Sequence, residues 1–342
     1  MQEKNNKKSL FKIIKKILPL IGIIILAYLI YNIGIENLAS TFMKISPFHI
    51  IAVVLLTIPL AILANIQWQL VLKKQNIQIG FFESLKIAFI SSFYSAITPG
   101  KIGSYIKVAY LKEKTNEPYG KLFTNSIIFS VISLLSFFCF LFASSLFLIN
   151  KIPIVFPIIC IAFFIFLAII FFFYKKNRGE KAIHQLISLF IPKKTKKSFE
   201  KFADTFYYDF PNAKDLVLPF LIDFLPTIVV YSQLYLIALS LGIQIPYHEF
   251  ILICPIITAI TILPISPSAL GTRELTAVYL FSLYGVDPAT SVVLSLSGYL
   301  LLGLPSICLG AILALIWARN DKTCNYLNKI SSIRKELSLD AR

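Results

Sequence analysis

The chain has 342 residues, of which 57% are hydrophobic and only 15% are charged. Soluble domains carry about 25% charged residues, so this composition excludes an ordinary soluble enzyme. The many aromatic residues also exclude a disordered chain. The apolar residues fall in long runs and do not alternate with polar ones, which predicts an all-α, polytopic integral membrane protein and not a transmembrane barrel.

The net charge is +16, and the basic residues gather at both chain ends and between the apolar runs. This placement is typical of a membrane topology signal, and no nucleic-acid-binding motif accompanies it, so we expect no nucleic-acid partner. The five cysteines include no CxxC pair and the three histidines are scattered. We therefore expect no disulfide framework, no metal site and no cofactor.

The N-terminal segment carries six lysines before an apolar run at residues 17–33. This run is longer than the core of a usual signal peptide and lacks a small-residue cleavage site. It predicts a retained first span whose N-terminus is cytoplasmic.

The remaining apolar runs, in chain order, cover residues 48–72, 81–98, 122–149, 152–174, 216–241, 250–265, 275–286 and 291–317. Two of them break abruptly, one at Pro99-Gly100 and the other at Ser266-Pro267. Proline ends an incoming helix because it lacks a backbone N–H. The sequence therefore predicts a broken-helix hairpin at each place.

Loop charges favour hairpins that return to their own side of the membrane. In that arrangement every strongly basic loop faces the cytoplasm, and only Lys44 and Lys151 face outside. Single crossings would instead place Lys112, Lys114 and Lys121 outside. We expect about six full spans and two re-entrant hairpins in the plasma membrane, with both termini cytoplasmic.

The chain is predicted to be a single membrane domain, 1–342, with an inverted repeat. Its parts are the basic N-terminus and first span (1–33), repeat 1 (48–149, hairpin broken at 99–103), a connecting span and basic loop (150–214), repeat 2 (215–318, hairpin broken at 264–274) and a cytoplasmic tail (319–342). Inverted repeats with interrupted helices are typical of transporters, whose substrate site lies where the broken ends meet.

Each break also predicts chemistry. A helix that restarts after a break presents free N–H groups and its positive dipole end, which suit an anion such as phosphate. Ser or Thr is expected to cap the outgoing helices. Lys101 and Arg273 would add full charges beside the two turns. The alternative is that both breaks are helix kinks exposed in loops.

Other polar residues in the runs have open roles. Glu274 is either the ion-pair partner of Arg273 or a group that meets a substrate cation or a coupling proton. Asp223 lies some two turns inside its run, where its carboxylate is expected to be solvated. Glu83 and Lys86 are expected to form a surface pair, and the amides Asn65, Gln67 and Gln69 to form interhelical hydrogen bonds.

At its two breaks the sequence resembles the flippase-like family also called the lysylphosphatidylglycerol synthase transmembrane region. Pro99, Gly100, Gly103 and Lys107 match its first motif, in which Ser104 replaces an acid; Pro267, Gly271, Arg273 and Glu274 match its second. The resemblance covers about residues 10–320. It implies a substrate site at these residues. Lys101 is part of the same predicted site because of its place beside the first turn, and Ser104 and Asp223 are possible additional residues.

The resemblance also implies a function. It indicates a lipid translocase that moves a phosphate-bearing lipid, either an aminoacyl-phospholipid or a polyprenyl-phosphate-linked sugar, and no lipid synthesis, because the sequence shows no aminoacyltransferase domain. A separate lipid-modifying enzyme and a second copy of the chain are the expected protein partners. The alternatives are the membrane component of a phosphatidylglycerol lysyltransferase or of a lipid-phosphate-dependent glycosyltransferase, and a membrane scaffold.

Overall fold

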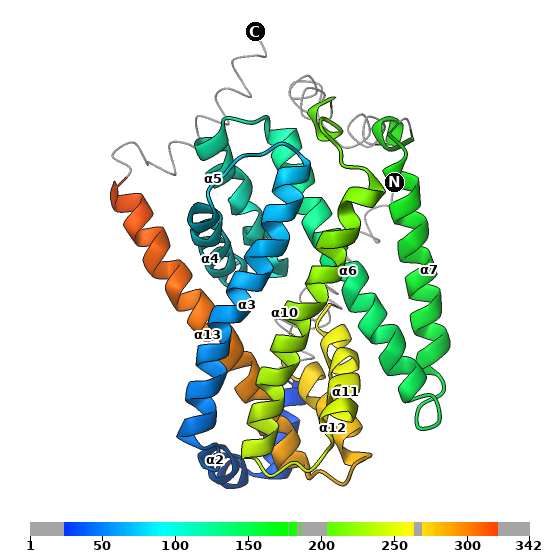
Figure 1. The fold of residues 1–342 in the computed structure, drawn as a ribbon. Coiled ribbons are helices and arrows are strands. Elements are labelled where there is room, and N and C mark those ends of the chain that lie inside the picture. The colour runs from blue at the N-terminus through cyan, green and yellow to red at the C-terminus, as the bar shows by residue number, and fades with distance from the viewer. Residues whose placement is uncertain (1–23, 177, 183–184, 186–203, 263–268, 321–342) are drawn as a thin grey trace, which may run out of the picture. The chain divides into compact units, whose positions relative to one another are not determined.

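The computed structural model describes residues 24–176, 178–182, 185, 204–262 and 269–320 (Figure 1). Both chain ends, the centre of the basic loop with Lys194, and the second break with Pro267 lie outside the described residues. Every regular element among those described is a helix. The expectation of an all-α, polytopic membrane protein is confirmed.

Five helices of the described chain are long and apolar enough to cross a membrane: α3 (Pro47–Lys74), α6 (Tyr119–Phe147), α7 (Val155–Tyr174), α10 (Ala213–Ser240) and α13 (Pro288–Asn320). Their ends lie within a few residues of the predicted runs, because the apolar runs are long and stop at polar or turn-forming residues. Pro59 and Pro226 both lie inside such helices without ending them.

The segment between the first two apolar runs, which contains Lys44, is helical for most of its length and forms α2 (Ile35–Met43). The chain bends by 82° between Ile24–Ile33 and α2. Gly34 sits at the bend with φ 86°, a conformation that glycine adopts without strain. Counting this bent pair as one span gives up to six spans among the described residues.

The first break forms a hairpin. It consists of α4 (Phe81–Ile97), a 3-10 helix η1 (Pro99–Tyr105) and α5 (Ile106–Thr115), which folds back against α4 (Figure 1). Glu83 near the start of α4 pairs with Lys114 near the end of α5 at 3.5 Å. The two helices are therefore antiparallel. The predicted surface pair of Glu83 with Lys86 is also present, at 3.1 Å.

A second hairpin is formed by α11 (Tyr247–Ile260) and α12 (Thr272–Ser282), which pack side by side (Figure 1). The rings of Phe250 and Phe281, at the start of α11 and the end of α12, stack with centroids 5.7 Å apart. The chain thus reverses direction across the break. The order of long helix, broken hairpin and long helix therefore occurs twice in the chain.

The chain divides into two compact units. Unit 1 contains residues 1–60, 137–159 and 226–305, and unit 2 contains residues 61–136, 160–225 and 306–342. Along the chain, α3 and α13 run from unit 1 into unit 2, whereas α6 and α10 run from unit 2 into unit 1. The inversion, the re-entrant character of the hairpins and the single domain stay predictions.

Each unit has its own buried core. The core of unit 1 surrounds the second hairpin and includes Phe250, Phe281 and Tyr231. The core of unit 2 surrounds the first hairpin and includes Trp68, Leu72 and Tyr110. The helices of each hairpin, α4 with α5 and α11 with α12, thus contribute buried residues to the core of their own unit.

Candidate functional site

The turn of the second hairpin ends on Gly271, whose φ of 84° favours glycine. Its N–H donates to Glu274 Oε2 at 2.6 Å, so the carboxylate caps the first turn of α12. The expectation of a Ser or Thr cap is wrong for this helix. Thr272 lies one residue too late, and its hydroxyl donates back to the carbonyl of Ala269 at 3.1 Å.

Arg273 forms the charged centre of this turn. Its Nε donates to Glu274 Oε1 at 3.0 Å and to Ser295 Oγ at 2.9 Å, and its Nη2 donates to Glu274 Oε1 at 2.5 Å. Both residues are buried, with exposed fractions of 9% for Arg273 and 0% for Glu274. The ion-pair role considered for Glu274 is present in the structure.

The guanidinium also packs on an aromatic ring, because Arg273 Cζ lies 4.9 Å from the ring centroid of Tyr299. No described residue accepts a hydrogen bond from Nη1 of Arg273. The planar guanidinium is therefore fixed on one edge by Glu274 and Ser295. Its other edge keeps donors for an oxyanion, the group that arginine binds in bidentate fashion.

A close backbone approach shapes the turn of the first hairpin. The N–H of Gly103 donates to Thr98 Oγ1 at 2.7 Å, and that hydroxyl donates to the carbonyl of Tyr94 at 2.8 Å. A Cβ at residue 103 would collide with the Tyr94 carbonyl oxygen. Ser104 adds a further link, since its own carbonyl accepts from Ser91 Oγ at 2.7 Å.

The basic residues of this hairpin have different surroundings. Lys101 follows Pro99 and Gly100 in η1, has a φ of 57°, and exposes its side chain. Lys107, on α5, is only 8% exposed. Its Nζ lies 4.7 Å from the ring centroid of Phe129 and 5.4 Å from that of Trp68. In unit 2 it is therefore Lys107, and not Lys101, that lies in the core.

Lys107 has no counter-charge among the described residues. Burial lowers the pKa of its ammonium to about 8. A desolvated cation–π contact contributes about 2 kcal/mol, whereas moving an ion out of water costs several kcal/mol. The two rings therefore offset only part of the cost of keeping this cation buried.

An amide network lies beside this lysine and was not predicted from the sequence. Trp68 Nε1 donates to Asn125 Oδ1 at 2.9 Å, and Asn125 Nδ2 donates to Gln75 Oε1 at 2.8 Å. The three side chains come from α3, α6 and the turn after α3. A row of amides on α3 was the only signal in the sequence, and it does not reveal the partner on α6.

Asp223 is buried, not solvated as expected. Its exposed fraction is 6%, and it accepts hydrogen bonds from Ser133 Oγ at 3.0 Å and from Ser136 Oγ. The expectation was wrong because it considered only how far Asp223 lies along α10 from the start of the helix. It did not take into account that α6 covers this face of α10 with two hydroxyls.

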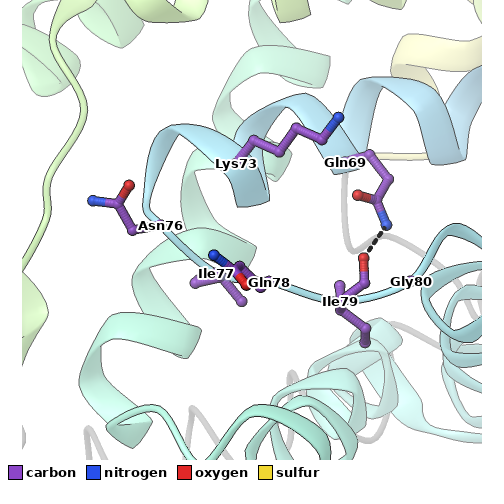
Figure 2. A pocket seen from close by; sticks show the side chains of 7 residues that line it. All are labelled: Gln69, Lys73, Asn76, Ile77, Gln78, Ile79 and Gly80. Atoms are coloured by element: carbon purple, nitrogen blue, oxygen red, sulfur yellow. Dashed lines mark hydrogen bonds between the residues drawn. The ribbon is translucent and has the colours of Figure 1, made fainter.

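The interhelical role of the α3 amides is confirmed for two of them. Ser84 Oγ donates to Asn65 Oδ1 at 2.9 Å and accepts from Gln69 Nε2 at 2.8 Å, which ties α3 to the first hairpin. Gln69 also donates to the carbonyl of Ile79 at 3.2 Å, as Figure 2 shows.

Gln69 also lines a cavity of about 540 Å³ at the end of α3, together with Lys73 and residues 76–80 (Figure 2). None of the predicted site residues lines this cavity. Within the described ranges, no group of His, Cys and acidic side chains is placed to hold a metal ion. The predicted site residues that the structure encloses are therefore the Arg273–Glu274 pair in unit 1, and Lys107 and Asp223 in unit 2.

Comparison with known proteins places the whole arrangement in a family. The model of the family described as lysylphosphatidylglycerol synthase TM region matches residues 17–310, which include both hairpins. The chain belongs to this family. A UPF0104 membrane protein of Pyrococcus horikoshii is 26% identical over 88% of this chain and 96% of its own length. Another, of Archaeoglobus fulgidus, is 25% identical over 60% of this chain and 67% of its own length.

The matched region includes both breaks. Membership supports a multi-pass membrane location and a role connected with membrane lipids. The relatives' names state only that they are membrane proteins. The activity must therefore be argued from the residues themselves.

Proposed function

We propose that the chain is a lipid translocase that moves a phosphate-bearing lipid across the plasma membrane. The substrate would be an aminoacyl-phospholipid or a polyprenyl-phosphate-linked sugar. The observation that carries the proposal is Arg273: a buried guanidinium beside a helix break, held on one edge and with donors left on the other. Membership of the family supports the lipid as the class of substrate.

The chemistry of the site favours phosphate over a neutral head group. An arginine inside a membrane protein is costly and usually marks a substrate or ion pathway. Glu274 keeps Arg273 oriented and offsets its charge. The N-terminal end of α12 adds the positive end of its helix dipole beside the same turn. Together these groups suit one oxyanion.

In the proposed topology Lys112 and both termini face the cytoplasm, and Asp287 faces outside. The loop charges support it, since the segments with several lysines then share one side. Six of the remaining predicted site residues would shape the turns: Pro99, Gly100, Gly103 and Ser104 in the first hairpin, and Pro267 and Gly271 in the second. A lipid-modifying enzyme would supply the substrate as a separate partner, and two copies of the chain would associate.

The test uses the purified chain in vesicles that carry a head-group-labelled lipid in one leaflet. We expect the chain to accelerate movement of a phosphate-bearing lipid between leaflets and to leave a labelled neutral glycolipid where it is. Equal acceleration of both lipids, or of neither, contradicts the proposal. Incorporation of lysine into phosphatidylglycerol by this chain alone would instead favour the lysyltransferase alternative.

A further inference from the structure

A cavity of about 380 Å³ lies between the first hairpin and the end of α13, wholly within unit 2. None of the predicted site residues lines it. A volume of this order is typical of small-molecule sites. Its wall combines charged and apolar side chains: Glu83, Lys86 and Ile90 of α4, Glu113 and Lys114 of α5, and Leu313, Ile316 and Trp317 of α13.

The way in which α13 packs on the hairpin leaves room for this cavity. A Cβ at residue 310 of α13 would lie 2.0 Å from the carbonyl oxygen of Phe89, so the two helices approach closely there. About two turns further along α13, the ring of Trp317 lies nearly perpendicular to that of Tyr110, with centroids 4.9 Å apart. Lys114 Nζ lies 4.8 Å from the centroid of the Trp317 ring. Large side chains therefore space α13 from the hairpin near its end, and the cavity opens beside them.

The wall of the cavity changes from charged to apolar along the helices. Glu83, Lys86 and Ile90 are spaced i, i+3 and i+7, so they share one face of α4. The two charged residues lie nearer the start of the helix, and the buried isoleucine lies one turn further along. On α13, Ile316 continues the apolar wall and is 50% exposed. Trp317 lies where the apolar run of α13 ends, a place that tryptophan favours at membrane surfaces.

The four charged side chains, which we call the charged rim, are Glu83, Lys86, Glu113 and Lys114. Glu83 accepts from Lys86 at 3.1 Å and pairs with Lys114 at 3.5 Å, so these three groups carry one net positive charge. Each ammonium has three N–H donors, which leaves donors for a phosphate oxygen. The carboxylate of Glu113, also exposed, suits a primary ammonium. The rim is therefore complementary to a head group that carries both a phosphate and an ammonium.

We propose that this cavity binds the head group of a zwitterionic phospholipid with a primary ammonium, of the phosphatidylethanolamine class. Lys86 and Lys114 would hold the phosphate, Glu113 would hold the ammonium, and the apolar end of α13 would contact the acyl chains. The site shares no residue with the Arg273 turn. It therefore goes beyond the proposed translocation and does not rest on it.

Trp317 offers a built-in reporter, since it lines the cavity, whereas Trp68, the other tryptophan of the chain, lies in the core. The full chain is reconstituted into phosphatidylcholine bilayers that contain a fraction of lipid brominated near the glycerol. Bromine quenches tryptophan emission at short range, so quenching measures how well each lipid class occupies the cavity. The brominated lipid is phosphatidylethanolamine, phosphatidylcholine or phosphatidylglycerol in turn. The differences between lipids should vanish in Trp317→Phe, and their persistence there would overturn the inference.

We expect phosphatidylethanolamine to bind about threefold more tightly than phosphatidylcholine, because choline cannot donate a hydrogen bond to a carboxylate, and more tightly than phosphatidylglycerol, which has no cation. Glu113→Gln should remove the preference for phosphatidylethanolamine. Lys86→Gln should weaken the binding of phosphatidylethanolamine and of phosphatidylcholine by about twofold to threefold, as is typical of exposed ion pairs, because both lipids carry the phosphate.

Two matched control variants lie outside the cavity. Glu36→Gln changes an exposed glutamate of α2, and Lys112→Gln changes a lysine of α5 that does not line the cavity. Both should keep the preference. Arg273→Gln should keep it as well, so failure of this site and failure of the translocase proposal are distinguishable.

Equal quenching by all three lipids overturns the inference, and so does the strongest quenching by phosphatidylglycerol. An undiminished affinity for phosphatidylethanolamine in both Glu113→Gln and Lys86→Gln also overturns it. If one of these two variants does not fold, the other decides alone.

Discussion

Glu274 joins two structural roles at one carboxylate: Oε2 accepts the N–H of Gly271 at 2.6 Å, while Oε1 pairs with Arg273. The same side chain therefore ends the turn of the second hairpin and holds the buried guanidinium in place. Because one carboxylate does both, the conformation of the turn and the position of the positive charge are coupled. A variant that separates the two roles tests how much each contributes.

Glu274→Gln is that variant, since it keeps an oxygen for the Gly271 N–H but removes the negative charge. We expect the free energy of unfolding to fall by about 3–5 kcal/mol, because Arg273 is then buried without a counter-charge. Thermal unfolding in detergent measures the loss. The double variant Arg273→Met, Glu274→Gln should recover much of it. A single variant as stable as the parent would show that the pair is not required.

Gly103→Ala tests the close approach in the first hairpin. A methyl group there would collide with the Tyr94 carbonyl, so the hairpin must shift, at a cost of about 1–3 kcal/mol. Gly80→Ala is the matched control, because nothing lies within 4 Å of an added Cβ and its φ of −64° suits any residue. The measurement is the unfolding midpoint of each variant. Equal midpoints would contradict this account of the turn.

The pKa of Lys107 predicts a dependence of stability on pH. Burial lowers this pKa from its ordinary value of 10.5 to about 8. Between these two values the unfolded chain holds a proton that the folded chain has released. Stability should therefore rise with pH across this window by about 1.4 kcal/mol per pH unit, and lose this dependence below it. The aromatic rings that face the ammonium, those of Trp68 and Phe129, do not titrate in this range.

The measurement compares the unfolding midpoint of the parent with that of Lys107→Met at pH 7, 8.5 and 9.5, in buffers free of phosphate. We expect the difference to change in favour of the parent as the pH rises. Parallel pH profiles of the two proteins would show that Lys107 is not desolvated in the folded chain.

The topology is tested with single cysteines in a background without the five native ones. A cysteine at Lys112 should react only with reagents that enter the cytoplasm, and one at Asp287 should react from outside, because the basic loops share one side. Labelling of position 112 from outside would contradict the re-entrant arrangement of the first hairpin.

The long helices could be predicted from the sequence because each is a continuous apolar run. The run at residues 48–72, for example, corresponds to α3 (Pro47–Lys74). The breaks could be predicted because proline stands next to glycine at 99–100 and next to serine at 266–267, whereas Pro59 and Pro226 have apolar neighbours on the N-terminal side and lie in helices that continue. These are local properties of the chain, and local properties are what a single sequence contains.

The surroundings of individual side chains could not be predicted in the same way. Lys101 and Lys107 lie six residues apart, yet one is exposed and the other is in the core. The 3-10 helix η1 determines the direction in which each lysine side chain points. The geometry of η1 could not be predicted from the sequence. Asp223 was misjudged for a similar reason, since Ser133 and Ser136 cover it from another helix.

Movement of a labelled phosphate-bearing lipid between leaflets, measured with Arg273→Gln in reconstituted vesicles, tests the central claim most directly. The matched control is Arg178→Gln, which removes an exposed arginine. We expect the control to move lipid at the rate of the parent. Arg273→Lys should retain part of that rate, because lysine keeps the charge but lacks the planar guanidinium. Arg273→Gln should fold but lose transport. Transport at the parental rate by a folded Arg273→Gln variant would contradict the account.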